Sequence, residues 1–148
     1  MPSTHLSLNY HLIFSTKNRE PWIEPRWRDQ LHTYMGGTIK GLGGIALAVG
    51  GVSDHVHLLI GLRATHSIAD VLRELKSESS RWVHETIREA AFVWQEGYGA
   101  ITVSPSHLED VRRYVLNQEE HHRTKTFQEE YREFLEKAGI AFDEQYLW

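Results

Sequence analysis

Two histidines two residues apart, His55 and His57, lie in an apolar segment that favours a β-strand, GGVSDHVHLLIGL over residues 50–62. Because residues i and i+2 of a strand face the same side, the two imidazoles are expected to emerge together. Imidazole is a common ligand of transition metals, and the rings of two residues whose Cα atoms lie about 7 Å apart along a strand can converge on one ion. The alternative is that one ring packs against a neighbour and the other faces solvent. Because unpaired polar rings are costly in so apolar a strand, the pair predicts a metal site instead.

Further donors follow in a segment with helical spacing. Tyr114 and Gln118 are four residues apart, so they are expected on one face of a helix, with His121 close behind. A glutamine carbonyl oxygen suits a hard divalent ion, and a tyrosine beside such an ion is a candidate nucleophile toward a phosphate that the ion polarises. The alternative for Tyr114 is an ordinary tyrosine at the margin of the core.

Composition limits the class of protein. The chain has 148 residues, and we expect one domain over residues 1–148. It has no cysteine, which excludes disulfides, zinc–thiolate sites and cysteine nucleophiles. The beginning of the sequence lacks the features of a signal peptide, and no apolar run approaches the ~20 residues of a membrane span. We therefore expect a cytoplasmic protein without a membrane partner.

Charge neither supports nor excludes nucleic-acid binding. The net charge is −4. Residues 1–105 hold ten basic and ten acidic residues, whereas residues 106–148 hold six basic and ten acidic ones, so the last third carries the whole excess. Contact with phosphate depends on local clusters of Lys and Arg rather than on the sum.

Hydrophobic periodicity predicts the order β-α-β-β-α-β-α-α. Strands are expected from Leu6 to Ser15, over 45–52 and 55–62 around a Ser53-Asp54 turn, and within 92–104. Helices are expected over 25–40, from Ser67 to about 87, from Ser106 to about 123, and from Thr126 to Gly139. The first six elements have the split β-α-β pattern. We therefore expect an α+β, ferredoxin-like fold, an antiparallel sheet with helices packed on it, followed by C-terminal helices that carry the tyrosine.

The sequence resembles the small single-tyrosine HUH transposases of the insertion-sequence 200/605 type and their relatives associated with repeated extragenic palindromes. The resemblance spans most of the chain. It rests on HLIFSTKNR, GGVSDHVHLLIGL, LKSESSRWV, WQEGYGAITVS and YVLNQEEHHRTKTFQEEY in that order. The most specific part is the histidine pair followed at this distance by Y-x-x-x-Q.

The resemblance implies a reaction and its residues. In such enzymes the two histidines, here His55 and His57, and the glutamine, here Gln118, hold a divalent metal, Mg²⁺ or Mn²⁺. The tyrosine, here Tyr114, attacks single-stranded DNA with hairpin ends and forms a 5′-phosphotyrosine intermediate in DNA transposition. Relatives often form dimers, so a homodimer is expected; whether the tyrosine helix acts in cis or in trans stays open.

Contacts with DNA are expected over the charge-balanced first two thirds of the chain. We expect five cations to contact phosphate: Lys17, Arg19, Arg63, Lys76 and Arg81. Trp94, unless it belongs to the core, and Tyr98 are candidates for stacking on an unpaired base. By helical angle at most one of His121 and His122 can reach the metal site, and we expect helix packing or phosphate contact for both.

Two other functions stay open. One is a domesticated relative that nicks or only binds genomic hairpin repeats. The other is a non-catalytic nucleic-acid-binding module of the same fold, although the central strand offers histidines and aliphatic residues where such modules carry aromatic pairs.

Overall fold

A four-stranded antiparallel sheet in the order β2-β3-β1-β4 organises the protein, in a computed structural model that describes residues 3–147. The main elements are β1 (Asn9–Ser15), α1 (Pro25–Gly41), β2 (Ile45–Gly51), β3 (His55–Gly61), α2 (Ile68–Trp82), β4 (Gly99–Thr102), α3 (Leu108–Leu116), α4 (Gln118–His121) and α5 (Phe127–Lys137). Short 3₁₀ turns occupy Lys17–Arg19, Pro105–His107 and Glu144–Tyr146, and a π-helical turn occupies Val83–Ile87. The predicted ferredoxin-like fold is confirmed, and so is the element order as far as β4, but α3, α4 and α5 follow where two helices were expected.

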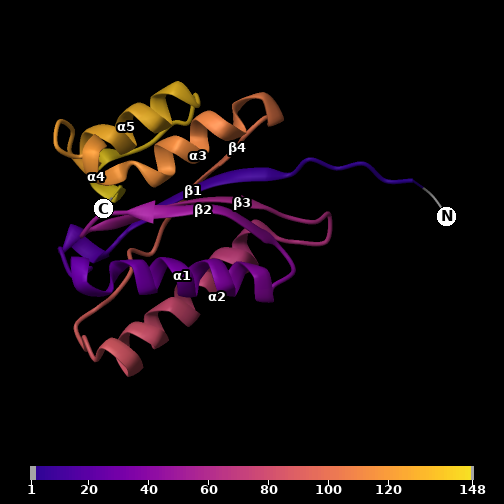
Figure 1. The fold of residues 1–148 in the computed structure, drawn as a ribbon. Helices are drawn as coiled ribbons and strands as arrows, with labels where there is room; N and C mark the ends of the chain where they lie inside the picture. The colour runs from indigo at the N-terminus through magenta and orange to yellow at the C-terminus, as the bar shows by residue number, and fades with distance from the viewer. Residues whose placement is uncertain (1–2, 148) are drawn as a thin grey trace.

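Helices cover both faces of the sheet (Figure 1), with α1 and α2 on one side and α3, α4 and α5 on the other. Even-numbered residues of β3, such as Val56 and Leu58, lie in the core with α1 and α2. Odd-numbered residues face α3, as the contact between Leu59 and Val115 shows. This alternation follows from the two-residue period of a strand, and it assigns the histidines to the side of the C-terminal helices.

The predicted start of the first strand was wrong. The strand begins at Asn9, which pairs with Gly61 at the end of β3, and Leu6 before it is 55 % exposed. The alternation of apolar and polar residues in the sequence begins at Leu6, but β3 ends opposite Asn9, so residues 3–8 have no strand to pair with. Trp94 is buried against Phe14 in the core, whereas Tyr98 is 37 % exposed.

The predicted continuous helix from Ser106 to about 123 was also wrong. Residues 105–107 form a 3₁₀ turn, so α3 begins after His107 and no side chain caps it, and the helix is interrupted at Asn117, whose ψ is 30°. The other two predicted caps are confirmed, because Ser67 Oγ accepts from the Asp70 amide at 3.4 Å and Thr126 Oγ1 accepts from the Glu129 amide at 3.2 Å. None of the helices within residues 3–147 is long and apolar enough to cross a membrane.

Candidate metal and nucleophile site

The imidazoles of His55 and His57 are completely buried beneath the C-terminal helices. Strand β3 holds them side by side, with ring centroids 5.2 Å apart. Neighbouring β1 pairs with β3 so that Ser15 lies opposite His55 and Ile13 lies opposite His57. The two rings are therefore fixed by a central strand that has partners on both sides.

Helix α3 brings Tyr114 to these histidines because the helix packs closely on the sheet. Its apolar stripe, which includes Val111 and Val115, contacts Ala48 and Leu59. The backbone approach is closest at Gly50, where a Cβ atom would lie only 1.9 Å from the carbonyl oxygen of Val115. The glycine thus permits the spacing that puts the Tyr114 ring centroid 5.5 Å from that of His57.

The interruption at Asn117 turns Gln118 toward the histidines. The Gln118 side chain is 1 % exposed, and its Nε2 donates to the carbonyl oxygen of Tyr114 at 3.0 Å. Its Oε1 is consequently directed inward and lies 3.4 Å from His55 Nε2. Tyr114 and Gln118 meet at the site as predicted, but from two helices rather than from one helical face.

Glu130 of α5 is the centre of the site, and the sequence interpretation did not identify it. Its side chain is 3 % exposed, and its Oε1 lies 2.8 Å from His57 Nε2 and 3.6 Å from His55 Nε2. The Tyr114 hydroxyl donates a hydrogen bond to its Oε2. The available signal was the Thr126 cap, which predicts α5 and puts Glu130 on its first turn. The residue spacing could not show that this turn packs against the two histidines.

Only one of His121 and His122 joins the metal-binding cluster, as predicted, but it is His122, for which helix packing or phosphate contact was expected. Glu130 Oε2 lies 2.9 Å from His121 Nε2 and 3.3 Å from His122 Nε2. His122 Nε2 also lies 3.0 Å from Gln118 Oε1. The expectation for His122 was wrong because it assumed one unbroken helix, whereas the chain leaves the helical path directly after His121.

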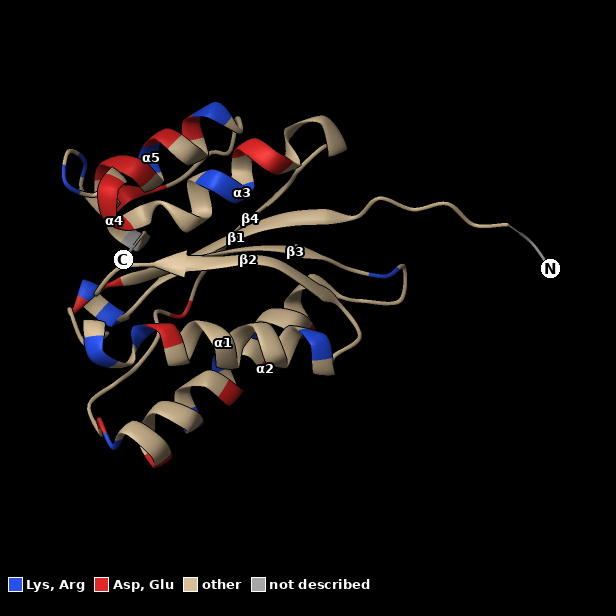
Figure 2. Cartoon of the chain, viewed as in Figure 1, with Lys and Arg blue, Asp and Glu red and all other residues tan. Residues whose placement is uncertain are grey.

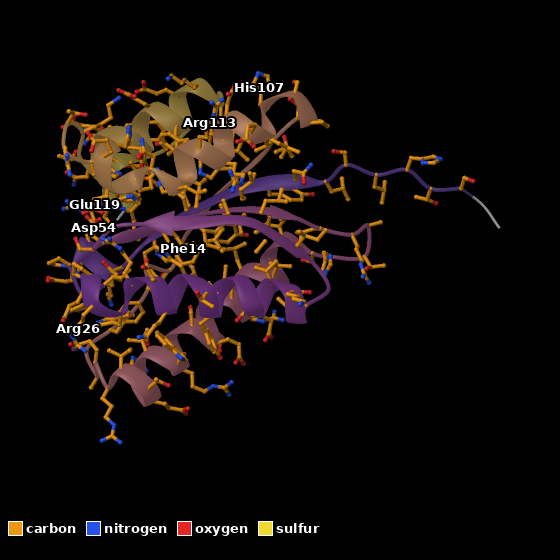
Figure 3. All side chains as sticks on the ribbon, in the orientation of Figure 1. Phe14, Arg26, Asp54, His107, Arg113 and Glu119 are labelled. Atoms are coloured by element: carbon orange, nitrogen blue, oxygen red, sulfur yellow. The ribbon has the colours of Figure 1, made fainter. Side chains whose placement is uncertain are left out.

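A second layer of contacts orients the strand histidines. His55 Nδ1 lies 2.7 Å from Asp54 Oδ1, and His57 Nδ1 lies 2.8 Å from His11 Nε2. In both rings Nδ1 is occupied by a partner and Nε2 faces Glu130, an arrangement common among metal-binding histidines. Figure 3 labels Asp54 at the end of the sheet where α4 lies.

Burial dominates the electrostatics of the site. It lowers the pKa of His57 to about 4, and burial together with the charge of His57 lowers the pKa of His11 to about 3. Burial and the adjacent charge of Glu130 raise the pKa of Tyr114. For the Glu130 carboxyl, burial raises the pKa, but hydrogen bonds from His122 and His57 outweigh it and hold the pKa far below its ordinary value.

These side chains form a cluster that could hold a metal ion. Ligand atoms of four buried or half-buried residues lie within 4.8 Å of one another: His55, His57, His122 and Glu130. Nitrogen and carboxylate oxygen donors on rigid elements fit a divalent ion.

The predicted DNA-contacting cations do not all lie near this cluster. Lys17 and Arg19 follow β1 at the end of the sheet that carries His55, whereas Arg63 lies beyond the other end of β3. Acidic residues gather on α3, α4 and α5 (Figure 2), as the charge count indicated.

Lys76 and Arg81 belong to α2, on the far face of the sheet. Arg81 forms an ion pair with Glu78. Lys76 Nζ donates to the carbonyl oxygens of residues 95, 96 and 97 at 2.8, 3.2 and 2.6 Å. The role of all five cations in DNA contact, and the homodimer, stay predictions.

The chain is similar in sequence and in fold to proteins described as transposases. The chain is similar to the ISDra2 transposase TnpA of Deinococcus radiodurans, with 26 % identity over 117 residues that cover 75 % of this chain and 84 % of the relative. Among solved structures, a crystal structure from the same organism, described as a transposase, has 27 % identity and a TM-score of 0.63 and covers 80 % of this chain and 95 % of that one.

A second solved structure has the same fold at lower identity. It is a REP-associated tyrosine transposase bound to a REP hairpin, with 13 % identity, a TM-score of 0.55 and coverage of 78 % of this chain and 67 % of the other. The family described as "Transposase IS200 like" matches residues 4–118, which include both histidines, the tyrosine and the glutamine. This chain therefore belongs to the IS200-like transposase family.

Proposed function

We propose that this protein nicks single-stranded DNA and transfers strands through a covalent bond to Tyr114, in the movement of a DNA element. The single observation that carries the proposal is the position of the Tyr114 hydroxyl, which donates to the same carboxylate that His57 contacts. A phenol held at a cluster of metal-binding type is in place to attack a phosphodiester.

In the proposed step the Tyr114 oxygen forms a bond to the phosphorus of the scissile phosphate and the bond from phosphorus to the 3′ oxygen breaks. The phenol loses its proton and the leaving 3′ oxygen gains one, so the products are a 5′-phosphotyrosine and a free 3′-hydroxyl. The reverse attack by a 3′-hydroxyl rejoins DNA. The phosphodiester is exchanged for another phosphodiester, so strand transfer needs no external energy source.

The residues of the chain have distinct roles in this proposal. His55, His57 and Gln118 would hold Mg²⁺ or Mn²⁺, and their inward-facing Nε2 and Oε1 atoms fit such an ion. The ion, when bound, would neutralise the negative charge that develops on the phosphate. Glu130 orients the phenol of Tyr114, because its carboxylate accepts a hydrogen bond from the Tyr114 hydroxyl.

A cavity beside the tyrosine offers room for the substrate. Its volume is about 210 Å³, and it is lined by Tyr114, His121, Lys125, Glu130, Glu133, Phe134 and Lys137. Of the two lysines in this lining, Lys125 forms an ion pair with Glu133 at 2.6 Å, so Lys137 is the one better placed to attract a phosphate to the tyrosine.

Formation of a covalent adduct tests the proposal. Labelled single-stranded oligonucleotides with a hairpin are incubated with the protein and Mg²⁺ or Mn²⁺, and the products are separated on denaturing gels. We expect a shifted protein–DNA band that is absent in Tyr114→Phe and present in the control Tyr98→Phe, which changes a partly exposed tyrosine outside the site. A band that persists in Tyr114→Phe contradicts the assignment of the nucleophile.

A second candidate function is favoured by the likeness to the REP-associated tyrosine transposase, whose solved structure contains a hairpin. A domesticated protein of this kind would nick or only bind genomic hairpin repeats. It would form no joined product when the oligonucleotide carries both ends of an element, whereas a mobile-element transposase would join them.

A further inference from the structure

Three histidine rings in the site share one arrangement. In His55, His57 and His122 the Nδ1 atom contacts a partner outside the cluster, and Nε2 points into it. For His122 the partner is the carbonyl oxygen of Lys125, at 2.6 Å. His121, by contrast, directs Nε2 toward the outer oxygen of Glu130 and is 26 % exposed at its side chain.

The partners of Nδ1 set the protonation pattern of two of these rings. A backbone carbonyl and a carboxylate can only accept, so Nδ1 of His122 and Nδ1 of His55 carry the hydrogen. In a neutral ring the lone pair then resides on Nε2. When both rings are neutral, both Nε2 atoms are therefore acceptors that face the interior of the cluster.

A third acceptor faces the same point. Gln118 donates through Nε2 to the Tyr114 carbonyl, so its Oε1 is the atom that lies 3.0 Å from His122 Nε2 and 3.4 Å from His55 Nε2. Three acceptors so close repel one another unless a positive charge stands between them, either a proton or a metal ion.

Glu130 adds a negative charge to these acceptors. Within the described part of the chain, every ion-pair contact of this buried carboxylate comes from an imidazole: His55, His57, His121 and His122. A buried carboxylate without lysine or arginine in its ion pairs is stabilised when a cation binds beside it.

The distances between donors fit a compact ion. Metal–donor distances of ~2.0–2.2 Å put the donors of a tetrahedral site about 3.3–3.6 Å apart. Glu130 oxygens lie 2.8 Å from His57 Nε2, 3.6 Å from His55 Nε2 and 3.3 Å from His122 Nε2. The contacts of His57 and His55 are to Oε1 and that of His122 is to Oε2, and the four donors lie within 4.8 Å of one another. Side-chain shifts of up to about 1.5 Å therefore bring them to the spacing of a tetrahedral site.

We propose that His122 and Glu130 join His55, His57 and Gln118 as direct ligands, which makes the centre selective for a transition metal such as Mn²⁺, Co²⁺ or Zn²⁺ over Mg²⁺. Three imidazoles and one carboxylate are softer donors than the oxygen set that Mg²⁺ requires. The inference deepens the proposed function and rests on its metal requirement.

Metal binding without DNA tests the inference on the full-length chain. Affinities for Co²⁺, Zn²⁺, Mn²⁺ and Mg²⁺ are measured by isothermal titration calorimetry. We expect Co²⁺ and Zn²⁺ to bind at least ~100-fold more tightly than Mg²⁺. The variants His122→Gln and Glu130→Gln should each weaken Co²⁺ binding ~10-fold or more, whereas the control Glu129→Gln, on the exposed neighbour of Glu130, should not.

The visible spectrum of the Co²⁺-loaded wild-type protein gives a second readout that needs no variant. A four- or five-coordinate site with three imidazoles absorbs strongly, whereas a largely hydrated six-coordinate ion absorbs weakly. A weak spectrum, or wild-type Co²⁺ affinity in both variants, overturns the inference.

The two proposals fail separately. A Tyr114 adduct with Mg²⁺, together with unchanged Co²⁺ binding in His122→Gln and Glu130→Gln, refutes the ligand set and leaves the reaction intact. Tight Co²⁺ binding that depends on both residues, without any DNA adduct, refutes the reaction and leaves the metal centre.

Discussion

The hydroxyl of Tyr114 donates a hydrogen bond to Oε2 of Glu130, and the other oxygen of that carboxylate lies 2.8 Å from His57 Nε2. One carboxylate on α5 thus connects the nucleophile on α3 with the histidine strand β3. Burial and this carboxylate raise the pKa of Tyr114, so the free protein holds the phenol protonated and oriented. The contact also shows that one chain contains both parts of the proposed site.

The proximity of Tyr114 to His57 of its own chain predicts that the tyrosine acts in cis. A mixture of Tyr114→Phe protein and His57→Ala protein should then form no covalent DNA adduct, because neither chain contains a complete site. Denaturing gels with labelled hairpin oligonucleotide measure the adduct, with wild-type protein as the reference. Recovery of adduct in the mixture would show that the tyrosine helix is exchanged between chains.

Close approach of α3 to β2 predicts that Gly50→Ala displaces the nucleophile. The added methyl would lie 1.9 Å from the Val115 carbonyl oxygen, one residue after Tyr114. We expect a loss of about 1–3 kcal/mol in the free energy of unfolding and a fall of ~10-fold or more in the rate of adduct formation.

The matched control is Gly37→Ala, in the exposed part of α1. A Cβ atom at Gly37 meets no atom within 4 Å, and alanine in a helix interior stabilises by roughly 0.5–1 kcal/mol. Chemical denaturation and a single-turnover adduct assay compare the two variants. Equal free energies of unfolding and equal rates of adduct formation in Gly50→Ala and Gly37→Ala would contradict this packing of α3 on β2.

Burial of His32 predicts acid sensitivity on the opposite face of the sheet. Burial, with a smaller effect of the Arg28 charge, lowers the pKa of His32 from 6.5 to about 4. Because the unfolded chain binds this proton more readily, stability is complete above about pH 6.5 and decreases toward pH 4, by roughly 1–3 kcal/mol from this residue.

Other buried histidines shift in the same direction, so the variant His32→Gln isolates this contribution. The loss of unfolding free energy between pH 7 and pH 4.5, measured by urea denaturation, should be smaller in His32→Gln than in the wild-type protein. An identical pH dependence in both proteins would refute the assignment.

The contacts of Lys76 predict that this residue stabilises the fold rather than binds DNA. Lys76→Met removes the donor that three carbonyl oxygens of residues 95–97 share, and should lower the free energy of unfolding by about 1–3 kcal/mol. The exposed Arg63 serves as the comparison.

Arg63→Ala should leave stability unchanged and, if Arg63 contacts phosphate, lower the slope of log K against log salt by about 0.7 for single-stranded DNA. Thermal melts and DNA titrations at several salt concentrations measure both effects. Full stability of Lys76→Met combined with weaker DNA binding would assign Lys76 to the DNA surface instead.

Much of the fold could be predicted from the sequence because its signals are local. The two-residue period of β1, the apolar run of β3 and the caps at Ser67 and Thr126 identify strands and helices without knowledge of their partners. The histidine pair could be recognised for the same reason, since two residues on one face of a strand remain neighbours in any fold.

The rest of the site depends on contacts between distant segments. Glu130 lies 73 residues from His57, and only the path of the chain after Asn117 brings α5 over the sheet. His11 contacts His57 because of the register in which β1 and β3 pair, and this register could not be predicted from the sequence. The break at Asn117 has no proline or glycine signal, so His122 was assigned away from the site.

The central claim is that Tyr114 becomes covalently linked to DNA, and peptide mass spectrometry tests it most directly. Protein incubated with a single-stranded hairpin oligonucleotide and Mn²⁺ is denatured, digested with nuclease and protease, and analysed for peptides that carry a residual 5′-nucleotide. The account predicts this added mass on Tyr114 alone, and its absence when the metal is chelated. The mass on another residue, or DNA cleavage without any peptide adduct, would contradict the account.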